Sequence, residues 1–199
     1  MSLPRLSPPQ PWVPMTDAQW LALLPFVLPR SPQGRRVSDL RRRMDGIFWI
    51  AASRGAPWRD LPERFGKPDT VARFFRRLTH GGLWQRLLRE LALTDSPAHP
   101  LRQIEHAVCR ATRRAARLGG LHLLVLIRRL GLRSALNGPP WLLPDPDLSE
   151  TLRRFPLPAV PTTRKAADAA LATVRSVAAL LRHAAGRRSM PRSVRWGWP

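Results

Sequence analysis

Three arginines at helical spacing are the residues of this chain best suited to bind an anion. Arg73, Arg76 and Arg77 lie in TVARFFRRLTH, where they alternate with apolar residues. Side chains three or four positions apart share one face of a helix, so the three guanidinium groups are expected to point the same way. A guanidinium group binds phosphate through two parallel hydrogen bonds and stacks on bases. The spacing predicts a DNA-binding helix face, and the alternative interpretation is an ordinary solvated charged face.

Other basic residues flank this helix in the sequence, and we expect them to add to DNA binding. Residues 30–90 hold 15 lysines and arginines against 6 acidic residues, a net charge of +9. Half or more of the hydrogen bonds in protein–DNA complexes go to the backbone, so several of these cations are expected at phosphates rather than at base edges. The candidates outside the helix face are Lys67, Arg64, Arg59, Arg41, Arg42, Arg43, Arg35 and Arg36.

The composition of the whole chain agrees with an acidic partner. Its 199 residues include 34 Lys and Arg but 13 Asp and Glu, giving a formal net charge of +21. Such a surplus favours nucleic acid first and an anionic membrane surface second. The longest apolar run, residues 121–127, is far shorter than a membrane-spanning helix, and the N-terminus lacks the apolar region of a signal peptide. We therefore expect a cytoplasmic, nucleoid-associated protein.

The metal-binding and redox residues are few. Cys109 is the single cysteine, which excludes an internal disulfide and a zinc site built from several cysteines. It lies on an apolar helical stripe and is predicted to be buried. The histidines show no metal-ligand spacing, so neither a metal ligand nor a cofactor is predicted.

The apolar periodicity predicts an all-α fold and gives no credible sheet. Residues 16–92 are predicted to form four main helices and one short turn-helix, each with its apolar residues on one face. Within residues 60–80, a short helix, a tight turn and a longer helix have helix–turn–helix form, whose second helix fits the major groove of DNA. The residues expected to fix the turn are Trp58, Leu61, Pro62, Phe65 and Gly66.

Proline and glycine clusters divide the chain into segments of different character. The region after the helical domain is expected to be helical but less ordered, and rich in proline and arginine. We predict a disordered leader at 1–14, a helical DNA-binding domain at 15–92, a helical hairpin-like extension at 93–138, a proline-rich linker at 139–163, an alanine-rich helix at 164–186 and a disordered basic tail at 187–199.

Four strings follow one another between residues 15 and 92: TDAQWLALLP, SPQGRRVSDLRRRMDGIFWIAASRGAPWRDLPERFG, DTVARFFRRL and GGLWQRLL. In order and spelling this segment resembles the N-terminal helical domain of bacterial insertion-element transposases. GAPWRDLPERFG is long and therefore specific, whereas TDAQW alone would be a weak signal. The resemblance implies binding of duplex DNA at the ends of an insertion element.

In that family the helical domain precedes a catalytic domain of RNase-H-like fold, where three carboxylates hold two divalent metal ions. This chain departs from the pattern, because no strands are predicted after residue 92. Mg²⁺ would be implied only by such a domain, so no catalytic residue is assigned, and whether the protein is an enzyme stays open. The acidic residues in this part are Asp95, Glu105, Asp145, Asp147, Glu150 and Asp168.

Two other interpretations of the chain stay open. In one, the protein is a non-enzymatic interaction protein whose helices at 100–136 dock on a protein partner or an anionic membrane surface, with LHLLVLIRRL as the apolar and basic stripe. In the other, the sequence is a translated pseudogene fragment that never accumulates as a folded protein. The C-terminal half is also a candidate for homo-oligomerisation or for binding a partner protein.

Overall fold

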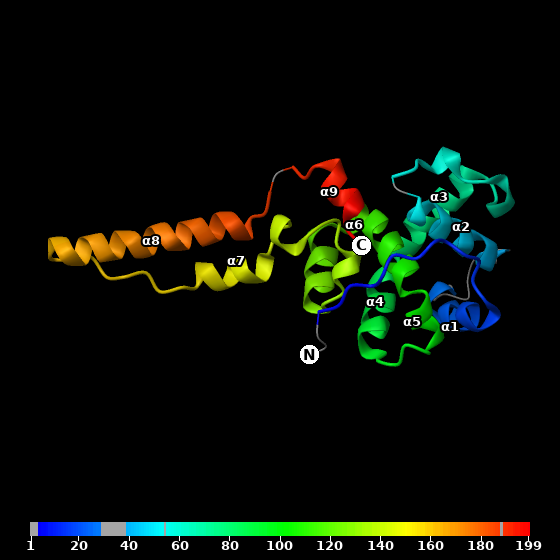
Figure 1. The fold of residues 1–199 in the computed structure, drawn as a ribbon, viewed down its shortest axis with the longest axis horizontal. Coiled ribbons are helices and arrows are strands. Elements are labelled where there is room, and N and C mark those ends of the chain that lie inside the picture. The colour runs from blue at the N-terminus through cyan, green and yellow to red at the C-terminus, as the bar shows by residue number, and fades with distance from the viewer. Residues whose placement is uncertain (1–3, 29–38, 54, 188) are drawn as a thin grey trace. The chain divides into compact units, whose positions relative to one another are not determined.

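The protein is all-α over the residues that the computed structural model describes, which are 4–28, 39–53, 55–187 and 189–199 (Figure 1). Among these residues there is no strand beyond one isolated bridge between Arg5 and Leu132. The predicted fold class is therefore confirmed. Contacts divide the chain into two compact units, residues 1–137 with Pro199 and residues 138–198.

The first unit is a set of helices joined by short connections. Helix α6 packs against α2, α3 and α4, so the core of this unit forms around it. Over the described residues of both units, no helix is long and apolar enough to cross a membrane. The elements of the first unit are α1 (Asp17–Val27), α2 (Leu40–Ala52), η1 (Trp58–Asp60), η2 (Glu63–Phe65), α3 (Pro68–His80), α4 (Leu83–Leu93), α5 (Pro100–Gln103), α6 (Glu105–Arg129) and η3 (Arg133–Ala135).

The apolar core joins elements from both sides of the domain boundary that we predicted at residue 92. Leu91 of α4 and Val108 of α6 are both fully buried, and the two helices are in contact. Small residues of α6, Ala111 and Ala115, have no exposed surface, which lets neighbouring helices approach closely. The segment at 93–138 thus supplies a wall of the core and belongs to the first unit, up to residue 137.

Two 3-10 turns precede α3 at the place where the sequence predicts a short helix. Phe65 N–H donates to Pro62 O at 3.0 Å and Gly66 N–H donates to Glu63 O at 2.8 Å, so these hydrogen bonds span three residues rather than the four of an α-helix. Gly66 ends the turn at a φ of +102°, a conformation that favours glycine. Leu61 and Phe65 are buried and anchor the segment. The predicted helix–turn–helix form is not confirmed.

The N-terminal segment, predicted as a disordered leader, lies extended against the first unit over residues 4–14. Arg5 N–H donates to Gly131 O at 2.9 Å, and Arg133 N–H donates to Arg5 O at 3.0 Å. Ser7 is buried. Proline disfavours helix but suits extended backbone, and here the extended backbone pairs with the loop that follows α6. The structure therefore differs from the expected disorder because distant residues supply partners for this segment.

The second unit is built on α7 and α8, which pack together. Helix α7 forms inside the predicted proline-rich linker because Asp145 caps it, accepting from Leu148 N–H at 3.1 Å, and Pro146 occupies its first turn. A short helix also lies within the predicted disordered tail. The elements of this unit are η4 (Pro140–Leu142), α7 (Pro146–Arg153), α8 (Arg164–Ala184) and α9 (Arg192–Gly197).

The single cysteine, Cys109, is fully buried in α6, as predicted. Burial raises the pKa of its thiol to about 12, and the neighbouring Glu105 carboxylate adds to the rise. Because the thiolate is the reactive form, the folded protein holds this side chain in an unreactive state.

Candidate nucleic-acid interface

Helix α3 has one apolar face and one basic face. Phe74 and Phe75 are 4% and 3% exposed. Arg73, Arg76 and Arg77, named here the outward arginines, are all exposed. Because the apolar residues pack against the first unit, the outward arginines are directed to solvent on the opposite side.

Aromatic contacts fix α3 in place. The Phe75 ring lies 5.3 Å from the Trp58 ring and 5.6 Å from the Trp84 ring, measured between centroids. Trp84 is fully buried, and its Nε1–H donates to Thr79 Oγ1 at 2.8 Å. The Thr79 hydroxyl in turn donates to Phe75 O at 2.9 Å. Trp58 therefore packs the turn onto α3, and the basic face of α3 is held at a defined orientation.

The outward arginines have no acidic partner among the described residues of the chain. The Arg77 guanidinium lies 5.4 Å from the centroid of the Phe74 ring, and the Arg43 guanidinium of α2 lies 5.8 Å from the same ring. Arg43 therefore comes next to the basic face of α3, although the sequence separates it from Arg73 by 30 positions. Unpaired cations held side by side on a rigid helix are suited to bind phosphate.

Arg41 and Arg42, also predicted to bind DNA, are engaged within the protein. The Arg41 guanidinium pairs with Asp17 at 2.5 Å and donates to Met15 O at 2.5 Å. The Arg42 guanidinium pairs with Asp39 at 2.6 Å. Both ion pairs are at least partly exposed, so they neutralise charge without excluding water. These two residues are weaker candidates for DNA contacts than Arg43.

Arg59 and Arg64 lie within the two 3-10 turns, η1 and η2. The Arg59 side chain is 3.7 Å from the Asp60 carboxylate, and both are exposed. The Arg64 guanidinium lies 4.9 Å from the Phe65 ring and 5.7 Å from the Trp12 ring. Arg64 thus covers aromatic surface of the turn, where its stem is held although its charge stays accessible.

Three predicted DNA-binding residues complete the set. Lys67 is exposed at the start of α3, where it is the N-cap residue. Arg35 and Arg36 lie outside the residues that the structure describes. Arg43 of α2 therefore lies next to α3, and Lys67 lies at its start. The other described candidates, Arg41, Arg42, Arg59 and Arg64, contact acidic or aromatic side chains elsewhere.

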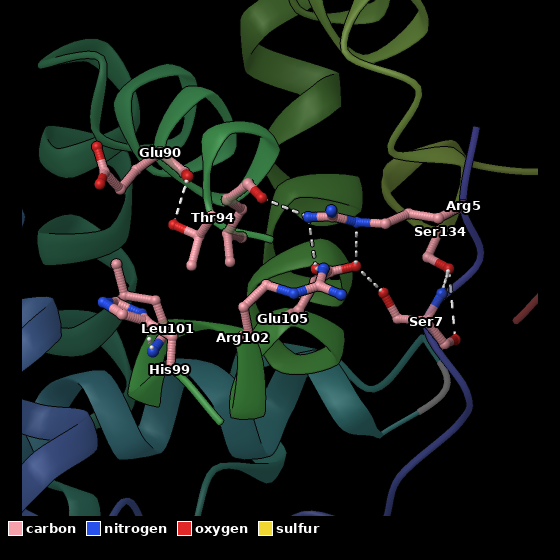
Figure 2. Close-up of polar contacts among 10 residues, drawn as sticks. Arg5, Ser7, Glu90, Thr94, His99, Leu101, Arg102, Glu105 and Ser134 are labelled. Carbon is pink, nitrogen blue, oxygen red and sulfur yellow. Dashed lines mark hydrogen bonds and ion pairs between the residues drawn. The ribbon is translucent and has the colours of Figure 1, made fainter. Parts of the chain in front are cut away.

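Sequence reasoning missed a buried carboxylate at the centre of a polar network, Glu105. Figure 2 shows Arg5, Arg102 and Ser7 directed at this side chain from different segments. The Arg5 guanidinium pairs with Glu105 Oε2 at 2.9 Å and also donates to Leu91 O, while Arg102 pairs with the same oxygen. Ser7 Oγ–H donates to Glu105 Oε1 at 2.5 Å. The only signal in the sequence is an acidic residue beside apolar helix positions.

A second missed carboxylate, Asp45, lies in α2. Its Oδ1 accepts from Met15 N–H at 3.1 Å, and the residue is 9% exposed. Burial raises its pKa, against a smaller lowering by that hydrogen bond and by the Arg41 charge. Asp45 and Glu105 fix the segments before α1 and at the start of α6, and neither faces the outward arginines of α3.

The acidic residues of the C-terminal part do not assemble into a metal site. Within the described residues, no group of three or more His, Cys, Asp or Glu side chains is placed to hold a metal ion. Glu105 is committed to Arg5 and Arg102, and Glu150 pairs with Arg154 at 2.9 Å in the second unit. The residues present therefore do not fit the two-metal carboxylate centre of the family, and no catalytic step is derived through it.

Comparison with protein families identifies the segment that carries α3. Residues 15–88 match the family described as "Putative transposase of IS4/5 family (DUF4096)". The match contains α1, α2, α3 and both 3-10 turns, and it ends within α4, before α5 and α6. The resemblance to the N-terminal domain of insertion-element transposases is thus confirmed over this segment. Over these residues the chain is similar to transposases of the insertion-element type.

One relative aligns with a part of the chain of similar length. "Uncharacterized protein y4sN" of Sinorhizobium fredii (strain NBRC 101917 / NGR234) is 36% identical over 80 residues. The alignment covers 39% of this chain and 62% of that relative, so the chain spans less than two thirds of the relative's length. No solved structure matches the chain.

Proposed function

We propose that the protein binds duplex DNA through the basic face of α3, as a transposase-like protein of an insertion element without a catalytic centre of its own. One observation carries the proposal. The outward arginines share an exposed helix face, and none has an acidic partner among the described residues. The DNA backbone supplies a row of negatively charged phosphates, and each guanidinium group can bind a phosphate through two parallel hydrogen bonds.

The dimensions of α3 suit a DNA groove. The helix has 13 residues, and at 1.5 Å per residue it is about 20 Å long. An α-helix of ordinary diameter fits the major groove, where side chains reach base edges and the flanking phosphates. Arg43 and Lys67, which lie beside and before α3, are proposed at phosphates. The ends of the insertion element are the proposed binding site, and the nucleoid within the cytoplasm is the proposed location.

The competing proposal is docking of residues 100–136 on a protein or membrane, and part of the apolar surface that it needs is buried. Leu123 and Ile127, from the apolar run that would form the docking stripe, are each 1% exposed. Leu118 and Leu121 remain 44% and 55% exposed. Because Leu123 and Ile127 lie in the core of the first unit, the run cannot dock with its whole apolar surface, and this burial favours the DNA proposal.

The test is binding of the full-length protein to duplex DNA over a range of salt concentrations. Changing Arg73, Arg76 and Arg77 together to alanine is expected to weaken binding roughly 100-fold at low salt. The slope of log affinity against log salt should fall by about 0.9 for each DNA phosphate that the variant no longer neutralises. The matched control changes Arg153, Arg164 and Arg175, three exposed arginines of the second unit, and so removes the same charge.

The control separates a local interface from a general charge effect. If both triple variants lose affinity equally, the net charge of the chain binds DNA and the α3 proposal is wrong. If the α3 variant keeps both the affinity and the salt slope of the unmodified protein, the outward arginines are only a solvated helix face. Loss of affinity in the α3 variant alone supports the proposal.

A further inference from the structure

An arginine outside the family-matched segment holds the turn in front of α3. Arg114 of α6 donates from Nη1 to Ala56 O at 2.9 Å. Its guanidinium carbon lies 4.5 Å from the centroid of the Trp58 ring, close enough for a cation–π contact. One half-buried side chain therefore contacts both the backbone and the aromatic ring of the GAPW turn.

This contact continues into α3. The other neighbour of the Trp58 ring is Phe75, at 5.3 Å, and Phe75 follows Phe74 and precedes Arg76 in the helix. Phe75 also meets Trp84 of α4, so the ring is fixed from two sides. A shift of the Trp58 ring would change the surface on which α3 rests, because close-packed aromatic rings transmit displacement to their neighbours.

We propose that Arg114 is a positioning residue for DNA binding: from α6 it holds the Trp58 turn against α3 and so sets the orientation of the outward arginines. The inference rests on the proposed function, because orientation matters only if that face binds DNA. It also enlarges the functional unit beyond residues 15–88, since the matched segment lacks α6. Arg114 itself need not touch DNA.

The test compares Arg114→Ala with Arg114→Lys in the full-length protein. Arg114→Ala should raise amide hydrogen exchange at Asp60 and Leu61, whose N–H groups form the hydrogen bonds of η1. Affinity for duplex DNA should fall roughly fivefold, with an unchanged slope of log affinity against log salt. Arg114→Lys keeps a cation that can lie over the Trp58 ring, and it should restore part of the protection and part of the affinity.

The matched control is Arg117→Ala, which removes an exposed arginine one turn further along α6. It should leave exchange at Asp60 and Leu61 unchanged. All binding is measured at a temperature where circular dichroism shows the same helix content for every variant. If Arg114→Ala fails this criterion, it is replaced by Arg114→Gln.

Two results would overturn the inference. If Arg114→Ala leaves exchange at residues 60 and 61 unchanged, Arg114 does not hold the turn. If the slope of log affinity against log salt falls by about one, Arg114 contacts a phosphate directly instead of acting through the turn. Failure of the proposed function looks different: the Arg73, Arg76 and Arg77 triple variant would bind DNA normally, while the exchange result would still report on the turn.

Discussion

Two groups of arginines in the first unit differ in what their guanidinium groups contact. The outward arginines of α3 are exposed, and none has an acidic partner among the described residues. The second group, named here the held arginines, is directed inward: Arg5, Arg102, Arg113 and Arg114. Both groups lie in a strongly basic chain, but only the first keeps its hydrogen-bonding capacity for another molecule.

Arg113 shows what a held arginine does. It is 9% exposed, and its Nε–H donates to Ser134 O at 2.6 Å. Burial lowers the pKa of its guanidinium to about 10, and the Arg110 charge adds to the lowering. Such a group joins α6 to the loop behind it and cannot reach a phosphate. The contacts that each arginine makes, more than the number of arginines, therefore identify a binding face.

The largest effect on stability is expected where two held arginines share one carboxylate. Glu105→Ala leaves Arg5 and Arg102 without their buried counter-ion, which should lower the free energy of unfolding by about 3 kcal/mol. Urea denaturation followed by circular dichroism measures the change. Glu105→Gln, which keeps one acceptor oxygen, should lose less. A loss no greater than that of the exposed control Glu63→Ala would show that the network contributes nothing.

For one outward arginine, Arg76, we expect a smaller effect on stability and a clear effect on DNA binding. Arg76→Ala should change the free energy of unfolding by less than about 0.5 kcal/mol, because the side chain is exposed. Its effect should appear in DNA binding, as a salt slope lower by about 0.9. Fluorescence anisotropy with a labelled duplex measures this slope. If Arg76→Ala clearly lowers the free energy of unfolding and leaves DNA binding unchanged, Arg76 belongs with the held arginines, and the distinction between the two groups is wrong.

A small effect of opposite sign, a gain of stability, is expected at Asp45, a buried carboxylate beside the Arg41 ion pair. Its folded-state pKa is raised above the ordinary value of 3.8, so the folded protein binds this proton more tightly than the unfolded chain. The ionised group therefore costs stability as pH rises from about 3.8 through the raised pKa. Asp45→Asn keeps an oxygen that can accept from Met15 N–H and removes this cost.

At pH 7 Asp45→Asn should thus unfold with a free energy higher by less than about 1 kcal/mol, and at pH 3 the two proteins should be equally stable. Denaturation midpoints measured at both pH values check the sign. A variant that is less stable at pH 7 would mean that the negative charge of Asp45 is needed, with Arg41 as its partner.

Local sequence patterns predicted what depends on neighbours in the chain. The apolar stripe of α3 is buried because residues at helical spacing share a face. The exposure of Arg73, Arg76 and Arg77 follows from the same periodicity. The Trp58 ring of the turn before α3 lies 5.3 Å from the Phe75 ring, because a large apolar side chain in a short turn needs a surface to cover.

What depends on distant partners was not predictable from these patterns. Arg5 pairs with Glu105 across 100 positions, and no local signal links the proline-rich start of the chain to α6. For the same reason residue 92 was a misleading boundary: the alanines of α6 look like ordinary helix formers, and only the assembled core shows that α2 and α4 pack on them. The engagement of Arg41 and Arg42 likewise depends on acidic residues that no spacing rule selects.

The burial of Cys109 makes the chain its own reporter of opening. A thiol reagent can attack this single sulfur only when α6 separates from the helices around it, since the folded state both covers the thiol and keeps it protonated. The rate of modification therefore measures how often α6 separates from the helices around it, α3 among them. Modification of this one sulfur therefore distinguishes the folded core from the opened core, and no cysteine needs to be introduced for the measurement.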